Sequence, residues 1–150
     1  MKTILDSAHE ASIRSRVGSL RPDAPAQWGR MSVSQMLCHL IDAFRVPLGD
    51  TEAAFKGGIL TSYPVRWLLI YQLPWPKGKI PTAPEYLQTQ PTSWEGDVKT
   101  WSDCLDRFLA RARHDDAGWG THPAFGDLST REWGRLTYLH SDHHLRQFGA

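Results

Sequence analysis

Three of the seven histidines lie close together in the segment HSDHHLRQFG, residues 140–149. If this segment is helical, His140 and His144 are four residues apart and lie on the same face, whereas His143 is turned about 100° away from His144. Two histidines with this spacing can chelate a metal ion. The alternative is that these residues are polar side chains on an exposed helix, and the spacing favours the chelating pair.

His39 is the candidate for a third ligand. It lies in QMLCHLIDAF, residues 35–44, at the border of an apolar stripe with helical period. A single histidine in such a place is more often part of the packing, but the chelating pair changes that balance. Three neutral imidazoles at about 2.0–2.1 Å from zinc leave a coordination position open, as in catalytic zinc sites. Imidazole suits nickel as well as zinc, so the spacing does not name the ion.

Polar side chains near these imidazoles are expected to fix their tautomers. Gln147 is the first candidate, because it follows His144 by three residues and shares its side of the helix. Asp42 is the second candidate, and Asp142 is expected to face water. His143 stays open as a ligand in place of a neighbour if the helix is rotated.

Four Ser/Thr-x-x-Glu/Gln patterns indicate where helices begin, because such capping boxes satisfy the free amides of a first helical turn. They are Ser7 with Glu10, Ser32 with Gln35, Thr92 with Glu95, and Ser129 with Glu132. Apolar residues then recur at helical period over residues 33–44 and 94–112. The last helix is expected over about residues 130–148 and a shorter one over about residues 63–72. No stretch has the clear alternation of a strand.

The sequence therefore predicts an all-α fold, a four-helix bundle with an extra short helix, in a single domain over residues 1–150. The segment PWPKGKIPTAPEY, residues 74–86, holds four prolines and one glycine and is expected to form a long crossover loop. Trp133 and Leu136 lie on the apolar face of the last helix, so its histidines are expected to point toward the core.

Three segments of the sequence carry a family resemblance: RPDAPAQWGRMSVSQMLCHL (residues 21–40), PKGKIPTAPEY in the crossover, and HPAFGDLSTREWGRLTYLHSDHHLRQFG (residues 122–149). The most specific part is a His-Leu pair in the second helix, then His-x-x-x-His with Gln three residues further on. His39, His140, His144 and Gln147 stand at these places. The chain thus resembles the DinB-like superfamily of metal-binding four-helix bundles, specifically its DUF1569 branch, over almost its whole length.

This resemblance implies that the three histidines hold a divalent metal, often nickel or zinc. Some members of the superfamily are thiol-dependent transferases or isomerases that use mycothiol, bacillithiol or glutathione, so the resemblance also implies such an activity. We therefore expect a metal-dependent thiol S-transferase or a hydrolase that acts on a small-molecule substrate. Two other hypotheses stay open. The chain could be a non-catalytic metal-binding or ligand-binding module related to stress, or a helical protein that has lost the metal.

Rival motifs fit less well. A zincin requires His-Glu-x-x-His, but Ser141 follows His140, and no glutamate is followed three residues later by histidine as a ferritin-like di-iron site requires. A hydrolase built on Cys38 and His39 fails because adjacent helical residues diverge by about 100°. Cys38 is therefore expected to pack in the core, and His122, which precedes a proline, is expected to have a structural role in a turn.

Composition narrows the partners. The chain has 17 Lys and Arg against 16 Asp and Glu, so its net charge of +1 gives no general attraction to nucleic acid or to anionic membranes. Its two cysteines form neither a Cys-x-x-Cys motif nor a disulfide framework, which is typical of a cytosolic protein. The most apolar run, residues 65–75, is shorter than the roughly 20 residues of a membrane span. We expect a soluble cytoplasmic protein that forms a homodimer through exposed helix faces.

Overall fold

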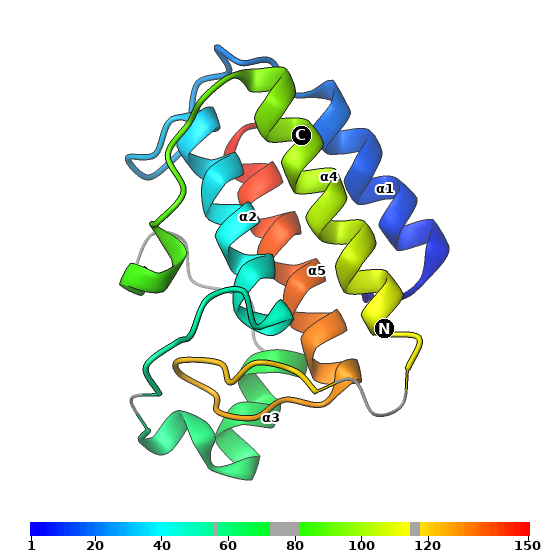
Figure 1. Ribbon diagram of the computed structural model, residues 1–150, viewed down its shortest axis with the longest axis vertical. Coiled ribbons are helices and arrows are strands. Elements are labelled where there is room, and N and C mark those ends of the chain that lie inside the picture. The colour runs from blue at the N-terminus through cyan, green and yellow to red at the C-terminus, as the bar shows by residue number, and fades with distance from the viewer. Residues whose placement is uncertain (56, 73–81, 115–117) are drawn as a thin grey trace.

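In the computed structural model the regular elements are all helical within the described residues, which are 1–55, 57–72, 82–114 and 118–150. The helices are α1 (Ser7–Ser19), α2 (Val33–Leu48), α3 (Tyr63–Tyr71), α4 (Trp94–Arg111) and α5 (Thr130–Gln147), with short 3-10 helices η1 (Ile59–Thr61) and η2 (Pro84–Tyr86). The long helices α1, α2, α4 and α5 pack side by side, and the short α3 lies at one end of them (Figure 1). The predicted all-α bundle with an extra short helix is confirmed.

Two of the four predicted capping boxes are present, and they begin α2 and α5, the helices that carry the candidate ligands. At α2 the Ser32 hydroxyl accepts from the backbone N–H of Gln35 (3.2 Å), and the Gln35 side chain accepts from the backbone N–H of Ser32 (2.9 Å). Ser129 and Glu132 form the same pair of bonds at α5. These bonds satisfy amides that would otherwise lack partners in the first turn.

The other two predicted caps are wrong by one residue. α1 is capped by Asp6 rather than Ser7, because the carboxylate of Asp6 accepts from two backbone N–H groups of the first turn. α4 is capped by Ser93 rather than Thr92. The amide and hydroxyl of Thr92 instead donate to the buried carboxylate of Asp97 (3.1 and 2.8 Å), which leaves the capping position to its neighbour.

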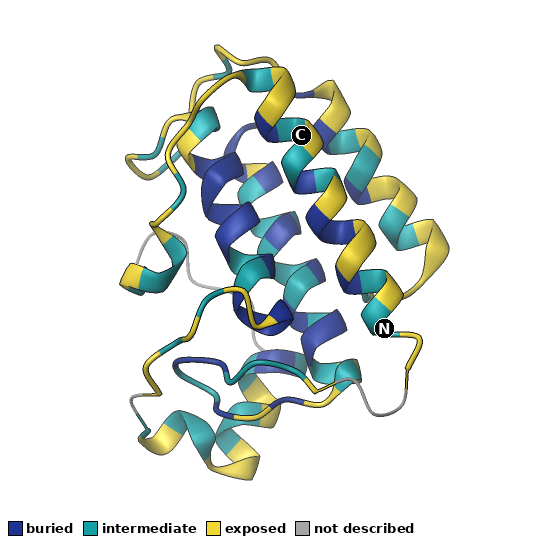
Figure 2. Ribbon diagram, in the orientation of Figure 1, coloured by how far each residue is buried: buried dark blue, intermediate teal, exposed yellow. Residues whose placement is uncertain are grey.

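The core lies between the helices, on their apolar faces (Figure 2). Phe44 of α2 meets Trp101 and Phe108 of α4, with ring centroids 6.4 and 5.7 Å apart. Trp101 and Trp133 are buried, whereas Trp94 is only partly buried. Within the described residues no helix has both the length and the apolar character needed to cross a lipid bilayer.

The short helix α3 begins where the sequence predicts it and ends at Tyr71, one residue earlier. Ser62 stands before it without capping it, because its hydroxyl donates backwards to the carbonyl of Ile59 (2.6 Å). The predicted crossover loop, residues 74–86, lies mostly outside the described residues. Its last part is described and ends in η2, which packs against α2.

Candidate metal centre

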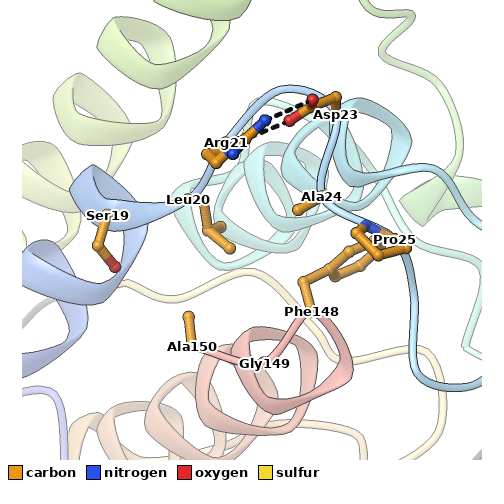
Figure 3. A pocket seen from close by; sticks show the side chains of 9 residues that line it. All are labelled: Ser19, Leu20, Arg21, Asp23, Ala24, Pro25, Phe148, Gly149 and Ala150. Carbon is orange, nitrogen blue, oxygen red and sulfur yellow. Dashed lines mark hydrogen bonds and ion pairs between the residues drawn. The ribbon is translucent and has the colours of Figure 1, made fainter.

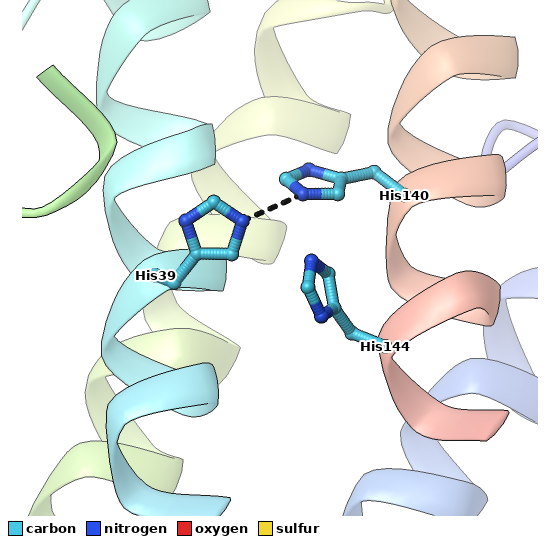
Figure 4. Close-up of side chains that lie close together, drawn as sticks. All are labelled: His39, His140 and His144. Carbon is cyan, nitrogen blue, oxygen red and sulfur yellow. Dashed lines mark hydrogen bonds between the residues drawn. The ribbon is translucent and has the colours of Figure 1, made fainter. Parts of the chain in front are cut away.

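His39 of α2 and two histidines of α5, His140 and His144, meet between the two helices (Figure 4). The centroid of the His39 ring lies 4.7 Å from that of His140 and 4.8 Å from that of His144, and the two rings of α5 are 4.9 Å apart. Each residue offers one ring nitrogen, and these three atoms lie within 4.8 Å of one another. The triad is the group of metal-ligating side chains found among the described residues.

The helices explain this convergence. His140 and His144 share a face of α5 because they are separated by one helical turn, and α5 packs against α2. His39 lies on a helix that is buried along most of its length, and its side chain is only 4% exposed. The three rings are therefore held by the same packing that forms the bundle.

A backbone carbonyl sets the tautomer of His39. Nδ1 of His39 lies 2.9 Å from the carbonyl oxygen of Tyr86, in η2. A carbonyl oxygen only accepts, so Nδ1 carries the proton and donates it. Nε2 of His39 is then left with its lone pair, and it lies 2.8 Å from Nε2 of His140. In the metal-free protein the proton in that contact belongs to His140.

A side-chain amide sets the tautomer of His144. Nδ1 of His144 lies 2.8 Å from Oε1 of Gln147, and Nε2 of Gln147 donates to the carbonyl of Trp28 (2.7 Å). The bond to Trp28 fixes which end of the amide faces the imidazole, so His144 also carries its proton on Nδ1. Nε2 of His144 is therefore unprotonated, and its lone pair is available to a metal ion. Gln147 is placed beside His144 as the sequence spacing predicted.

Burial keeps these imidazoles neutral. Desolvation is the main cause that lowers the pKa of His39, and it lowers the pKa of His140 well below its ordinary value. For His144, burial and the nearby His39 lower the pKa to about 3, against a smaller opposing effect of the hydrogen bond to Gln147. Neutral imidazole is the form that binds metals, so no proton needs to be removed from a cationic ring at neutral pH.

The arrangement fits a metal ion. Two zinc–nitrogen bonds of about 2.0–2.1 Å at a tetrahedral angle place their nitrogens roughly 3.3 Å apart. Nε2 of His39 and Nε2 of His140 are 2.8 Å apart, and the three ligand nitrogens lie within 4.8 Å of one another, so the zinc spacing falls between these two distances. Metal-binding histidines usually donate their other ring nitrogen to an oxygen acceptor, as His39 and His144 do here.

A comparison with protein-family models decides the family. The model of the DinB superfamily matches residues 9–148. The chain belongs to the DinB superfamily. Searches of curated proteins and of solved structures gave no significant match. The DUF1569 branch stays a prediction, while the DinB match spans all three histidines of the triad and Gln147.

Asp42 is expected from the sequence to bind an imidazole of the triad, but in this DinB-superfamily chain its carboxylate binds a loop instead. Its buried carboxylate accepts from the backbone N–H groups of Gln88 (2.7 Å) and Thr89 (2.8 Å), and also from the Thr89 hydroxyl. Those residues follow η2, so Asp42 anchors the loop that presents the carbonyl of Tyr86 to His39. A backbone acceptor on a distant loop takes the place expected for the carboxylate.

Of two other residues of α5, Asp142 differs from its prediction, and His143 is the bystander that the preferred spacing predicted. Asp142 does not face water: it pairs with Arg16 of α1 (2.7 Å) and with Arg146 (3.0 Å). His143 stacks edge to face on Trp28, with ring centroids 5.8 Å apart, and is not part of the triad. The rotation of α5 that the structure shows therefore selects His144 as the partner of His140.

His122 has the structural role that the sequence predicted. Its Nδ1 accepts from the backbone N–H groups of Ala124 (3.0 Å) and Phe125 (3.1 Å), and its backbone pairs with Gly126 across the same tight turn. Burial lowers the pKa of His122 to about 3. This imidazole closes the loop before α5 and is not one of the triad that could hold an ion.

A hollow of about 390 Å³ lies elsewhere in this DinB-superfamily chain, between the loop after α1 and the residues that follow α5 (Figure 3). Leu20, Pro25 and Phe148 contribute apolar walls, and Arg21 and Asp23 pair at its rim. None of the triad lines it. The candidate centre is thus identified by converging nitrogen atoms and not by a cavity.

Proposed function

We propose that the chain binds a divalent metal ion, zinc or nickel, through Nε2 of His39, His140 and His144. The observation that carries this proposal is that two separate acceptors, the Tyr86 carbonyl and the Gln147 amide oxygen, hold the protons of two imidazoles on the outer nitrogen. The inner nitrogens are then directed to one point. Packing alone would also require acceptors for buried imidazole N–H groups, but it does not require one ring nitrogen from each of three histidines to converge.

We further propose that the bound ion serves a reaction on a small molecule. Three protein ligands leave at least one coordination position open, as in catalytic and unlike structural zinc sites. When bound, such an ion acts as a Lewis acid that yields a thiolate or hydroxide nucleophile at neutral pH. The residues of the chain keep the imidazoles neutral and oriented, with Gln147 acting on His144 directly and Asp42 on His39 through the loop that holds Tyr86.

The proposed reaction class is thiol S-transfer, with hydrolysis as the second possibility. The thiol is an added low-molecular-weight compound, because the cysteines of the chain are buried and burial raises the pKa of Cys38 to about 11. Both are therefore poor nucleophiles at neutral pH. In the transfer, the thiolate sulfur forms a bond to an electrophilic carbon of the substrate and a leaving group departs.

A comparison of two histidine variants tests the proposal. We expect untagged protein to contain about one nickel or zinc ion per chain by elemental analysis, and His39→Ala to lose it. His143→Ala is the matched control, because it removes a neighbouring imidazole outside the triad and should keep the ion. The metal-loaded protein is then assayed with mycothiol, bacillithiol or glutathione against monochlorobimane.

The outcomes separate the metal from the reaction. Equal metal content in His39→Ala and His143→Ala would refute the site. A metal-loaded protein whose rate with every thiol equals that of His39→Ala would refute the S-transferase. That result would favour the alternative, a non-catalytic metal-binding module. This alternative is supported by the position of the triad, because an ion bound there would join α2 to α5. Its signature is a strong fall of the melting temperature on chelation without turnover.

Two further predictions concern the oligomeric state and the cellular location of the chain. A homodimer and a cytoplasmic location stay predictions. Ile59, Tyr63, Trp67 and Leu68, on η1 and α3, expose apolar side chains that would favour self-association. Light scattering of the purified protein measures the oligomeric state directly.

A further inference from the structure

The loop at residues 27–29 contacts Gln147 at three successive positions. The backbone N–H of Gln27 donates to the backbone carbonyl of Gln147 (2.7 Å), and the carbonyl of Trp28 accepts from Nε2 of Gln147 (2.7 Å). Gly29 then passes so close that a Cβ atom placed on it would lie 2.5 Å from Nε2 of Gln147. The side chain of Gln147 is thus enclosed between α5 and this loop, and Gln147 is only 4% exposed.

This loop decides which end of the Gln147 amide faces His144. An amide offers an oxygen that accepts and an NH₂ group that donates, and a flip by 180° exchanges them at little cost in shape. The carbonyl of Trp28 can only accept, so it holds the NH₂ group and leaves the oxygen for Nδ1 of His144. Without Trp28 in place, the flipped amide would donate to Nδ1 and move the imidazole proton to Nε2.

Glycine at position 29 is required for this arrangement by two independent features. Its φ angle is +81°, in the left-handed region that other residues rarely adopt. In addition, the first atom of any side chain would overlap the NH₂ group of Gln147, and the nearest way to relieve that overlap is to move the amide. A side chain at position 29 would therefore displace the Gln147 amide and so change the hydrogen bond of His144.

We propose that the 27–29 loop is a positioning element that sets the tautomer of His144 through Gln147, and that Gly29 is the residue that makes it possible. The effect on metal affinity rests on the proposed metal site. The tautomer itself does not, because it is a property of the metal-free protein. The two consequences can therefore be tested separately.

The test compares two glycine substitutions. Gly29→Ala and Gly49→Ala both place alanine at a left-handed residue, since Gly49, which ends α2, has a φ angle of +77°. They differ in space: a Cβ atom on Gly49 meets nothing within 4 Å, whereas one on Gly29 meets Gln147. Backbone strain is thus matched, and the contact with Gln147 is the difference.

The first measurement is made without metal. Imidazole ¹⁵N chemical shifts of metal-free protein distinguish the Nδ1–H from the Nε2–H tautomer, and the His144 signals are assigned by their loss in His144→Gln. We expect Nδ1–H in the wild type and in Gly49→Ala, and a mixture or the Nε2–H form in Gly29→Ala. Gln147→Met keeps the length of the side chain but removes both the oxygen and the NH₂ group of the amide, so it should give the same tautomer change as Gly29→Ala. It replaces Gly29→Ala in this test if Gly29→Ala does not fold.

The second measurement is zinc affinity, by competition with a chromophoric chelator. Changes to groups that orient metal-binding histidines typically weaken binding by about 10- to 100-fold, and we expect a loss of this size in Gly29→Ala and none in Gly49→Ala. On the Gln147→Met background, Gly29→Ala should cause no further loss.

The results separate the loop from the metal site. A wild-type His144 in the Nε2–H form, or an unchanged tautomer in both Gly29→Ala and Gln147→Met, would overturn the proposal. If the wild type binds zinc, equal zinc affinity in the two glycine variants would overturn it too. A wild-type protein that binds no zinc or nickel would instead refute the metal site, and the tautomer measurement would still decide the role of the loop.

Discussion

Helix α2 faces two different neighbours. Toward α4 it presents Phe44 to two aromatic rings, and this contact is made of apolar side chains packed edge to face. Toward α5 it presents His39 to the imidazoles of His140 and His144, and the outer N–H groups of His39 and His144 each need an acceptor. The apolar side is complete when the two helices meet. The polar side also depends on η2, which brings the Tyr86 carbonyl to His39, and on the loop whose Trp28 carbonyl holds the Gln147 amide beside His144.

The two sides of α2 should contribute differently to the stability of the fold. Apolar burial is favourable whatever the pH and contributes most of the stability of a bundle. Buried imidazoles remain neutral only at a cost, since the unfolded chain protonates them as the pH falls. We therefore expect the α2–α4 side to set the level of stability and the histidines to set its dependence on pH.

The largest expected effect comes from breaking the apolar side. Phe108 of α4 is fully buried and contacts the rings of Phe44 and Trp119, with centroids 5.7 and 4.8 Å apart. Phe108→Ala should lower the free energy of unfolding by about 3–5 kcal/mol, because it loses apolar burial and leaves a cavity. Urea unfolding at pH 7 measures this loss.

The control for this prediction is the same substitution at a half-exposed residue. Phe55 is 51% exposed, so Phe55→Ala should cost much less than Phe108→Ala. The difference between wild type and Phe108→Ala should also be nearly independent of pH, since no titrating group is removed. Equal losses in the two variants would show that the α2–α4 contact does not dominate stability.

The second prediction concerns pH. The pKa of His122 is about 3 in the folded chain and about 6.5 when unfolded, so its contribution to stability is complete above pH 6.5 and is lost as the pH falls toward 3. The slope is about 1.4 kcal/mol per pH unit, or roughly 2 kcal/mol between pH 6.5 and 5. Protonation of Nδ1 would also break the two bonds from Ala124 and Phe125.

The variant His122→Asn tests this directly. Asparagine does not titrate, and its side-chain oxygen can accept backbone N–H groups two and three residues further on. Urea unfolding from pH 7 to pH 5 should therefore give a shallower pH dependence than in the wild type, by about one proton. An unchanged slope would mean that His122 does not remain neutral in the folded chain.

Much of the fold could be predicted from the sequence, because helices with one apolar face carry their pattern locally. Residues 94–112 repeat apolar side chains at helical period, and α4 occupies almost that range. The residue at which α4 starts does not follow from the pattern, because Thr92 and Ser93 are both good caps. The choice between them depends on Asp97, whose buried carboxylate binds Thr92, and burial of that kind is not visible in the pattern.

The candidate site also has one part that the sequence predicts and another that it does not. The convergence of His39 with His140 and His144 follows from helix spacing and from packing between apolar faces. The partner of His39 could not be found by residue type, because the acceptor is the backbone carbonyl of Tyr86, 47 residues away, and every residue has such a carbonyl. Asp42 lies three residues from His39 in the sequence, but its carboxylate accepts from the backbone N–H groups of Gln88 and Thr89 instead.

The smallest expected effect separates the stability of α5 from the site that α5 carries. Ser129→Ala removes the hydroxyl that accepts from the Glu132 amide, and the loss of such a cap costs about 1 kcal/mol. Urea unfolding should show this decrease. Zinc affinity should not change, because His140 and His144 lie several turns further along the helix and the cap touches neither. If zinc binding weakened as much as in Gly29→Ala, the triad would depend on the whole of α5, and the local control assigned to the loop at residues 27–29 would be wrong.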